Sequence, residues 1–212
     1  VEECFYGSVM AFNWAERYQG PVMLLTEHSL AERAQNIRKP DLANIPVENR
    51  VRYTGGDGYL RYESKELSAF PSPGSPGSYV ANGSEHDVFG DTTHLAKYHI
   101  HMTERRFSKL GLLEDGAYEA ENTQAKIAVM PWGGSKGSVR EALDLLLEEG
   151  LDLGWYYTMF VSPLPAKMLA ELKSKDLVIV PELNFQGQMA LNLRSLGVKA
   201  EAITQYTGLP FG

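Results

Sequence analysis

The 212-residue chain has little of three things: cysteine, excess positive charge and long apolar runs. A single cysteine, Cys4, excludes an internal disulfide and a cluster held by several cysteines, and it fits a reducing cytoplasm. Twenty basic against 27 acidic residues give a net charge of −7. We expect no nucleic-acid partner, because phosphate backbones are held by clustered Lys and Arg. No apolar run approaches the roughly 18 residues of a membrane span, so we expect no membrane partner.

The rest of the composition is that of a folded globular chain, with 43% hydrophobic and 22% charged residues. The chain opens Val-Glu-Glu-Cys-Phe-Tyr, with neither Met nor the apolar core of a signal peptide. A helical pattern is already under way at the first residues. We therefore expect a piece of a longer protein.

In the first half, apolar side chains recur at helical spacing over residues 2–18, and Gly20 and Pro21 end the predicted helix. The apolar run 21–26 is typical of a strand buried on both faces. No comparable strand follows in this half, and a sheet of one strand is unstable. This segment therefore either completes a sheet with sequence upstream of Val1 or borrows one from a partner.

The middle of the chain, residues 38–95, is rich in Pro, Gly, Ser, Asp and Asn. We predict a long excursion with one hairpin around 50–63, kept in order by its aromatic residues. A helix is predicted over 98–113, followed by an acidic linker over 114–124.

The second half alternates strands with helices, which predicts a doubly wound α/β sheet. The strands are expected at 126–130, 151–159, 177–180 and 198–204, and the helices at 136–149, 165–173 and 187–196.

Two motifs suggest metal chemistry, and each has a simpler explanation. Gly56-Asp57-Gly58, followed at a distance by Asn82, has the spacing of a Mg²⁺–diphosphate motif, but a polar segment precedes it and favours a hairpin turn. Four of the five histidines lie close together in the sequence and suggest zinc, but their spacing matches no zinc template. Structural or surface histidines are favoured. These four are His86, His94, His99 and His101.

Two further motifs suggest ligand binding. Glu85, His86 and Asp87 can orient a substrate or perturb one another's pKa; the alternative is a salt-bridged loop with an Asx turn. The turn from Trp132 to Ser135, between a strand and a helix, suits an anion, but a tight turn is favoured. Residues 133–137 (GGSKG) fit the pattern Gly-x-Ser-x-Gly, but the tight turn is again favoured, so a hydrolase is not supported.

Six segments, taken in order, carry a family resemblance. They are AFNWAERYQG-PVMLLTEHSLAE, GSPG, GSEHDVFGDTTH with MTERR, VMPWGGSKGSVREAL, VIVPELNFQGQ and QYTGLPF. Together they resemble the alpha subunit of 2-oxoacid:ferredoxin oxidoreductases, especially the 2-oxoglutarate type. The resemblance implies that 1–37 is the C-terminal remnant of a pyrimidine-binding thiamine-diphosphate domain, 38–124 a connecting segment, and 125–212 a transketolase-C-like α/β domain.

The same resemblance implies an activity: oxidative decarboxylation of a 2-oxoacid with coenzyme A, giving an acyl-CoA, CO₂ and reduced ferredoxin. The family's catalytic residues are expected upstream of Val1, so this chain alone is expected to be inactive. Thiamine diphosphate, Mg²⁺, [4Fe-4S] clusters and coenzyme A belong to the complete complex, with a beta subunit and ferredoxin as partners. We expect this chain alone to bind none of these cofactors and to hold no metal. Thr26-Glu27 stands where the family has Ser-Asp.

The expected active-site contact is the loop 74–94, through Glu85, His86 and Asp87, with His94 behind them. Such a polar loop would close over the thiazolium and exclude water. Two alternatives stay open. One is another thiamine-dependent enzyme of the transketolase or dehydrogenase E1 beta type. The other is a non-catalytic assembly module that docks through exposed aromatics, for which Trp155, Tyr156 and Tyr157 are candidates.

Overall fold

The computed structural model describes residues 1–113 and 116–211. The chain forms two compact units. Unit 1 comprises Val1–Leu25 and Ala31–Leu112, and unit 2 comprises Thr26–Leu30 and Leu113–Gly212. Within the described ranges, no helix has the length and apolarity needed to cross a membrane.

Unit 2 is built on a five-stranded sheet in the order β1-β3-β2-β4-β5. The strands are β1 (Tyr118–Glu121), β2 (Ile127–Val129), β3 (Leu153–Thr158), β4 (Leu177–Glu182) and β5 (Ala200–Thr204). The last four run parallel, and β1 pairs antiparallel with β3 at one edge. In the centre, Val129 is in register with Trp155 on one side and Ile179 on the other.

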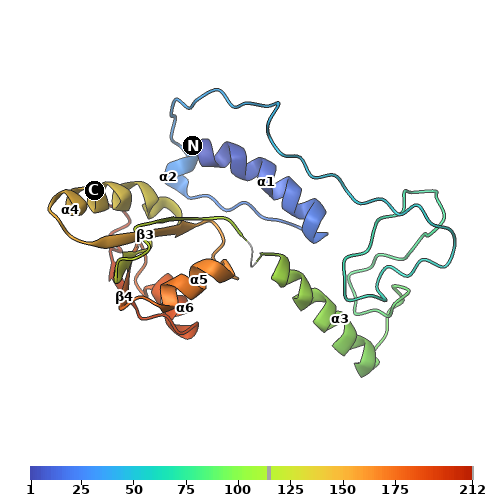
Figure 1. The fold of residues 1–212 in the computed structure, drawn as a ribbon. Coiled ribbons are helices and arrows are strands. Elements are labelled where there is room, and N and C mark those ends of the chain that lie inside the picture. The colour runs from blue at the N-terminus through green and yellow to red at the C-terminus, as the bar shows by residue number, and fades with distance from the viewer. Residues whose placement is uncertain (114–115, 212) are drawn as a thin grey trace. The chain divides into compact units, whose positions relative to one another are not determined.

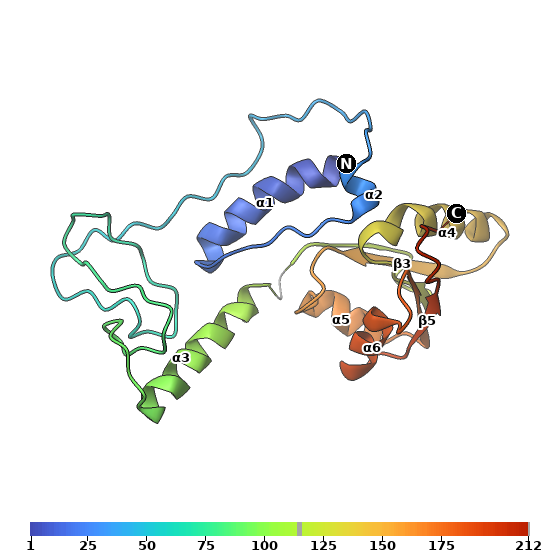
Figure 2. The ribbon, with the colours of Figure 1, turned by 180° about the vertical axis from the view of Figure 1, so that it is seen from behind.

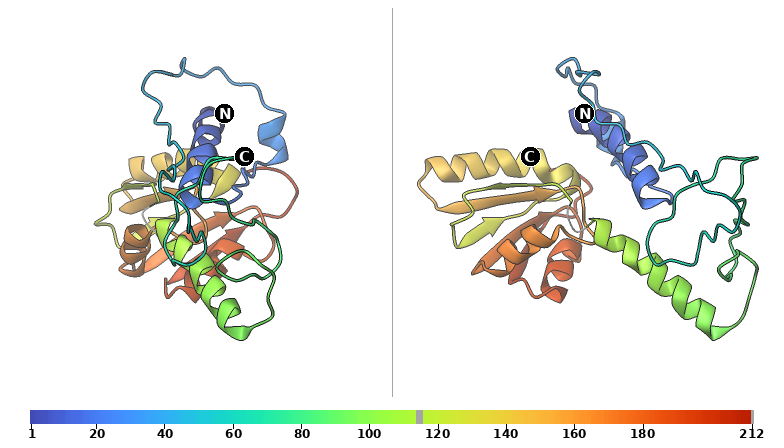
Figure 3. Two further views of the ribbon diagram at one scale, coloured as in Figure 1. Left: turned by 90° about the vertical axis from the view of Figure 1, so that its right-hand side faces the viewer. Right: turned by 45° about the vertical axis from the view of Figure 1, so that its right-hand side comes forward.

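Helices cover both faces of this sheet (Figure 1). The short 3₁₀ turn η2 (Gly133–Ser135) leads into α4 (Lys136–Glu148), which packs on one face. The helices α5 (Ala166–Lys173) and α6 (Gln188–Ser195) pack on the other. Figure 3 shows the three layers from the side. The predicted doubly wound α/β sheet is confirmed.

The central strand β3 shows how the two cores form. Side chains alternate between the faces of a strand. Trp155 and Tyr157 pack on the α4 side, whereas Tyr156 packs on the side of α5 and α6. All three rings are buried, with exposed fractions of 1%, 0% and 6% for Trp155, Tyr156 and Tyr157. They are core residues and not the exposed docking aromatics considered from the sequence.

The edge strand β1 lies in the segment 114–124, which was predicted to be a linker; residues 114 and 115 lie outside the described residues. Tyr118 and Ala120 are half-buried, and Glu119 and Glu121 are exposed. This is the alternation of a strand with one solvated face. The acidic side chains that suggested a linker are the outward half of the pattern.

Unit 1 contains α1 (Glu2–Tyr18) and α3 (Ala96–Ser108), followed by a 3₁₀ segment η1 (Lys109–Leu113). The short helix α2 (His28–Ala31) spans the change from unit 2 back to unit 1. Between α2 and α3 the chain has neither helix nor ladder of strands, as Figure 2 shows. Met102 is the one large apolar side chain of unit 1 that is fully buried.

Two predicted elements of the first half are not formed. The run 21–26 is irregular, and its apolar residues Val22 to Leu25 are 39–88% exposed. An apolar run forms a strand only beside another strand, and no strand of the described residues pairs with it. The hairpin at 50–63 is replaced by a single parallel bridge between Arg52 and Phe70. Ring contacts order this region instead, with Tyr53 and Tyr59 centroids 4.5 Å apart.

Candidate active-site loop

The predicted loop is anchored to α3 through Glu85. The guanidinium of Arg106 donates to both Glu85 carboxylate oxygens, at 3.3 and 3.2 Å, and His99 Nδ1 hydrogen bonds to the same carboxylate. His99 and Arg106 are seven residues apart, two helical turns, and so share one face of α3. The Arg106 hydrogen bond, followed by that of His99, lowers the pKa of Glu85 to about 2.

His86 is turned into the protein. Its ring lies against Tyr62, with centroids 4.3 Å apart, and is almost fully buried. Its Nδ1 is 2.8 Å from the Asp87 carbonyl oxygen, which can only accept. Nδ1 therefore carries the proton in the neutral ring, and Nε2 keeps a free lone pair.

Asp87 shapes the turn that follows. Its Oδ1 accepts the backbone N–H groups of Phe89 and Asp91, at 2.9 and 3.1 Å. This is the Asx turn that was the alternative to a functional acid. His94 is exposed, and the described residues give it no side-chain hydrogen bond. The four predicted site residues thus share one loop but make separate contacts.

The metal hypotheses gain no support. In the part of the chain that the structure describes, no three His, Cys, Asp or Glu side chains are placed to hold a metal ion. His101 Nε2 hydrogen bonds to the Tyr62 carbonyl at 2.7 Å. Asn82 Oδ1 accepts the Ser84 N–H, and its Nδ2 donates to the Gly90 carbonyl. Its amide therefore belongs to a turn and does not fit a Mg²⁺–diphosphate site with Asp57.

The turn before α4 was considered as an anion-binding site, and the structure places the carboxylate of Glu27 beside it. The Glu27 carboxylate lies so close to Gly134 that a Cβ there would be 2.0 Å from Glu27 Oε2. Both residues belong to unit 2. Helix N-termini favour negative charge, and here the chain supplies its own. A side chain at Gly134 would displace the Glu27 carboxylate, which ends an exposed, flexible side chain.

Sequence reasoning missed Glu182, a fully buried carboxylate at the end of β4. Its Oε1 accepts the Ala190 N–H at 2.9 Å. Its Oε2 accepts from Trp132 Nε1 at 3.2 Å, Asn184 Nδ2 at 2.7 Å and the Met189 N–H at 2.9 Å. The carboxylate thus caps the first turn of α6 from a distance. The signal in the sequence was an acidic residue at the end of an apolar strand.

Glu182 also lies at the place where ligands usually bind in this fold. In doubly wound sheets, ligands bind beyond the carboxyl ends of the strands where the strand order reverses, here between β2 and β4. Trp132 follows β2 and hydrogen bonds to Glu182 at the end of β4. The contact joins the two strand ends at that place.

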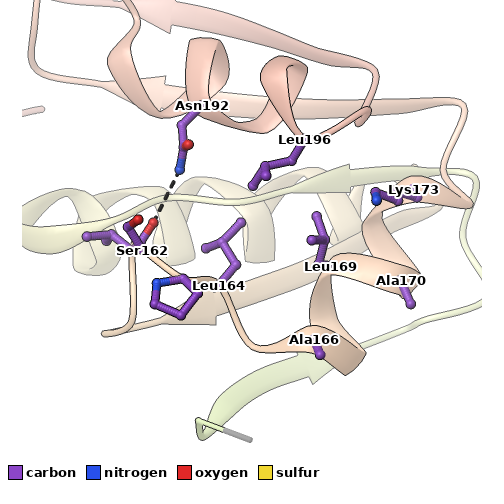
Figure 4. Close-up of a pocket in the computed structure, with 10 residues that line it drawn as sticks. Ser162, Leu164, Ala166, Leu169, Ala170, Lys173, Asn192 and Leu196 are labelled. Atoms are coloured by element: carbon purple, nitrogen blue, oxygen red, sulfur yellow. Dashed lines mark hydrogen bonds between the residues drawn. The ribbon is translucent and has the colours of Figure 1, made fainter. Parts of the chain in front are cut away.

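A shallow hollow of about 490 Å³ lies between α5 and α6 (Figure 4). Leu164, Leu169 and Leu196 line it, and Asn192 Nδ2 donates to the Val161 carbonyl at its edge. Lys173 is its one ionisable lining residue. The hollow has no carboxylate or imidazole for acid–base chemistry.

We compared the chain with known protein families, sequences and structures. No family model matches the chain. The structure superposes with a TM-score of 0.91 on 2-oxoglutarate:ferredoxin oxidoreductase from Magnetococcus marinus, solved with 2-oxoglutarate, coenzyme A and succinyl-CoA bound. The two sequences are 34% identical, over 99% of this chain and 38% of that one. The chain is homologous to 2-oxoacid:ferredoxin oxidoreductase alpha subunits.

Two curated relatives are similar to the chain in sequence. The chain is 30% identical to 2-oxoacid:ferredoxin oxidoreductase 2, subunit alpha, of Aeropyrum pernix, over 91% of this chain and 32% of that protein. It is 29% identical to the 2-oxoglutarate synthase subunit KorA of Methanocaldococcus jannaschii, over 96% of this chain and 55% of that protein. The chain therefore spans about a third to a half of the length of these curated relatives.

Proposed function

We propose that this chain is the C-terminal part of the alpha subunit of a cytoplasmic 2-oxoacid:ferredoxin oxidoreductase, with 2-oxoglutarate as the favoured substrate. The observation that carries the proposal is the match to the Magnetococcus marinus enzyme over 99% of this chain and 38% of that one. The reaction converts 2-oxoglutarate and coenzyme A to succinyl-CoA, CO₂, one proton and two electrons. The electrons pass to ferredoxin, and a beta subunit completes the enzyme.

In the complete enzyme, thiamine diphosphate with Mg²⁺ would supply the carbanion chemistry and [4Fe-4S] clusters the electron path. The described residues of this chain do not fit a site for those groups, because Asn82 is used in a turn and Cys4 is the sole cysteine. We therefore assign the chain a supporting part. Unit 2 supplies a rigid α/β body, and the loop 74–94 of unit 1 is proposed to cover the reacting centre.

Activity tests the first part of the proposal. The full-length alpha subunit is purified without oxygen, with the chains that accompany it, and the reduction of a low-potential viologen dye is followed. We expect reduction to require both coenzyme A and 2-oxoglutarate, and succinyl-CoA and CO₂ to form in equal amounts. Pyruvate is the comparison substrate. Absence of reduction with any 2-oxoacid, or absence of a second subunit in native mass spectrometry, would contradict the proposal.

The loop is tested by His86→Ala in the same complex. His86 is packed on Tyr62 and fixes the backbone between Glu85 and Asp87. Because lid residues act on binding and turnover together, we expect kcat/KM for 2-oxoglutarate to fall by about tenfold or more. His101→Ala is the matched control, since that imidazole contacts a backbone carbonyl outside the loop. Unchanged kcat and KM in His86→Ala would remove the loop from the active site.

A further inference from the structure

Unit 1 contains a cluster of three cations, Arg61, Arg105 and Lys109, that the proposed function does not use. Arg61 and Arg105 are 7% and 6% exposed, and Lys109 is half-buried. Basic side chains are rarely buried so deeply without a carboxylate.

Hydrogen bonds place two of the three cations, Arg61 and Lys109, at the same residue, Gln19. Arg61 Nη2 donates to the Gln19 side-chain oxygen at 3.2 Å, and Lys109 Nζ donates to the Gln19 carbonyl oxygen at 3.3 Å. Arg105 Nη2 donates to the Arg61 carbonyl at 3.3 Å, and its Nε to the Ser64 carbonyl at 2.9 Å. The tips of Arg61 and Lys109 thus meet around Gln19.

The cations of the cluster lie over aromatic rings, with Arg105 5.5 Å from the ring centre of Tyr62 and Lys109 5.1 Å from that of Tyr18. Among the described residues, no Asp or Glu forms an ion pair with any of the three cations. Burial, and then the charge of Arg61, lower the pKa of Arg105. Burial, and then the charges of Arg105 and Arg61, lower the pKa of Lys109. By contrast, Arg17 and Arg50 of the same unit are exposed and each pairs with a glutamate.

One donor in this cluster has no acceptor. Arg61 Nη1 is buried and makes no hydrogen bond. The guanidinium carbon of Arg61 lies 3.9 Å from the ring centre of Phe70 and 4.9 Å from the ring centre of Tyr79. Such stacking occupies the faces of a guanidinium and leaves its N–H edge for an acceptor in its plane. Capping of the C-terminal end of α1 explains the Lys109 bond to Gln19, but it leaves Nη1 unsatisfied.

We propose that Arg61, Arg105 and Lys109 form a binding site for a small oxyanion, a carboxylate or a phosphate, that accepts from Arg61 Nη1. An oxyanion supplies both missing features, a negative charge and an acceptor oxygen, and hydrogen bonds between ionised groups are the strong ones. The site does not depend on the proposed activity, because binding is measured without turnover.

Isothermal titration calorimetry of the intact complex with inorganic phosphate, and separately with succinate, tests the site. Sodium chloride at equal ionic strength is the control titrant. We expect saturable binding of at least one of them, which also identifies the class of anion. Lys109→Gln removes the least buried cation, and we expect it to weaken binding about tenfold or more. Arg61→Gln is expected to abolish binding, and Arg17→Gln to leave it unchanged.

Two outcomes would overturn the proposal: no saturable binding of either anion, or equal affinities in the unmodified protein and in Lys109→Gln. Thermal unfolding separates loss of the site from loss of the fold. A bound anion raises the unfolding temperature. We expect that rise in the unmodified protein and in Arg17→Gln, and not in a folded Lys109→Gln.

Discussion

At the scale of single residues, the buried Glu182 carboxylate of unit 2 accepts four hydrogen bonds. Four N–H donors converge on it, from the side chains of Trp132 and Asn184 and from the first turn of α6. Gly187, which precedes α6 with a φ of 66°, has no side chain to cap the helix. Glu182 takes over that role and ties the end of β4 to the segment after β2.

Glu182→Gln should therefore be costly although it changes one atom. The amide NH₂ turns a hydrogen-bond acceptor into a donor that faces other donors, and we expect a loss of about 2–3 kcal/mol in the free energy of unfolding. Urea unfolding followed by tryptophan fluorescence measures it. Glu201→Gln, an exposed position on β5, is the control and should change little. Equal stabilities of the two variants would show that the four hydrogen bonds contribute nothing net.

Glu85 gives a prediction in pH. Its pKa of about 2 lies below the ordinary 4.5. The ionised carboxylate therefore stabilises its contact with α3 fully above about pH 4.5, and this contribution is lost as the pH falls through about 2. Carbon-13 NMR of the Glu85 carboxyl group should show the low midpoint, and Arg106→Gln should raise it. Lys97→Gln, on the same helix, is the control and should leave the midpoint unchanged. A midpoint that Arg106→Gln does not move would show that Arg106 does not lower the pKa of Glu85.

At the scale of elements, the segment 26–30 places the Glu27 carboxylate against Gly134 of the turn η2. In Gly134→Ala, the new methyl group would occupy the position of the Glu27 carboxylate, so we expect faster hydrogen exchange over 26–30. Gly137→Ala is the matched control, because a Cβ there meets nothing within 4 Å. Exchange equally fast in both variants, or unchanged in Gly134→Ala, would show that the carboxylate does not hold the segment.

The same scale shows what the sequence can predict. The strands β2 to β5 and their helices were predicted because strand and helix patterns alternate along the second half, which supplies each strand with neighbours. β1 was missed because only Tyr118 and Ala120 of its residues face inward. The run 21–26 was wrongly predicted as a strand because pairing depends on a neighbour that its own residues do not reveal.

The candidate site, too, was predicted in part. The glutamate, histidine and aspartate of the loop were proposed from their types and spacing, but their contacts were not predicted. Glu85 depends on His99 and Arg106, which follow it on a separate helix. Glu182 and Arg61 escaped notice because burial of a charged side chain is set by distant packing, which local pattern does not record.

At the scale of the whole molecule, the two units differ in how they are stabilised. Unit 2 has an apolar core on each face of its sheet. Unit 1 buries one large apolar side chain and is held by polar and aromatic contacts. Burial of apolar surface is the dominant favourable term in folding.

We therefore expect a fragment of residues 116–212 to unfold cooperatively in urea, and a fragment of residues 1–112 to show no cooperative transition. Circular dichroism at matched concentrations checks both. A steep unfolding transition in the fragment 1–112, which has the smaller apolar core, would contradict this account of stability. So would the absence of a transition in the fragment 116–212.

The exposed run from Val22 to Leu25 has a consequence for handling the chain. Four consecutive apolar residues without an internal proline or charge are the kind of segment through which unpaired chains associate with one another. Such association depends on the square of concentration, whereas unfolding does not. The usable concentration of the free chain is then set by collisions between copies, however firmly unit 2 is folded.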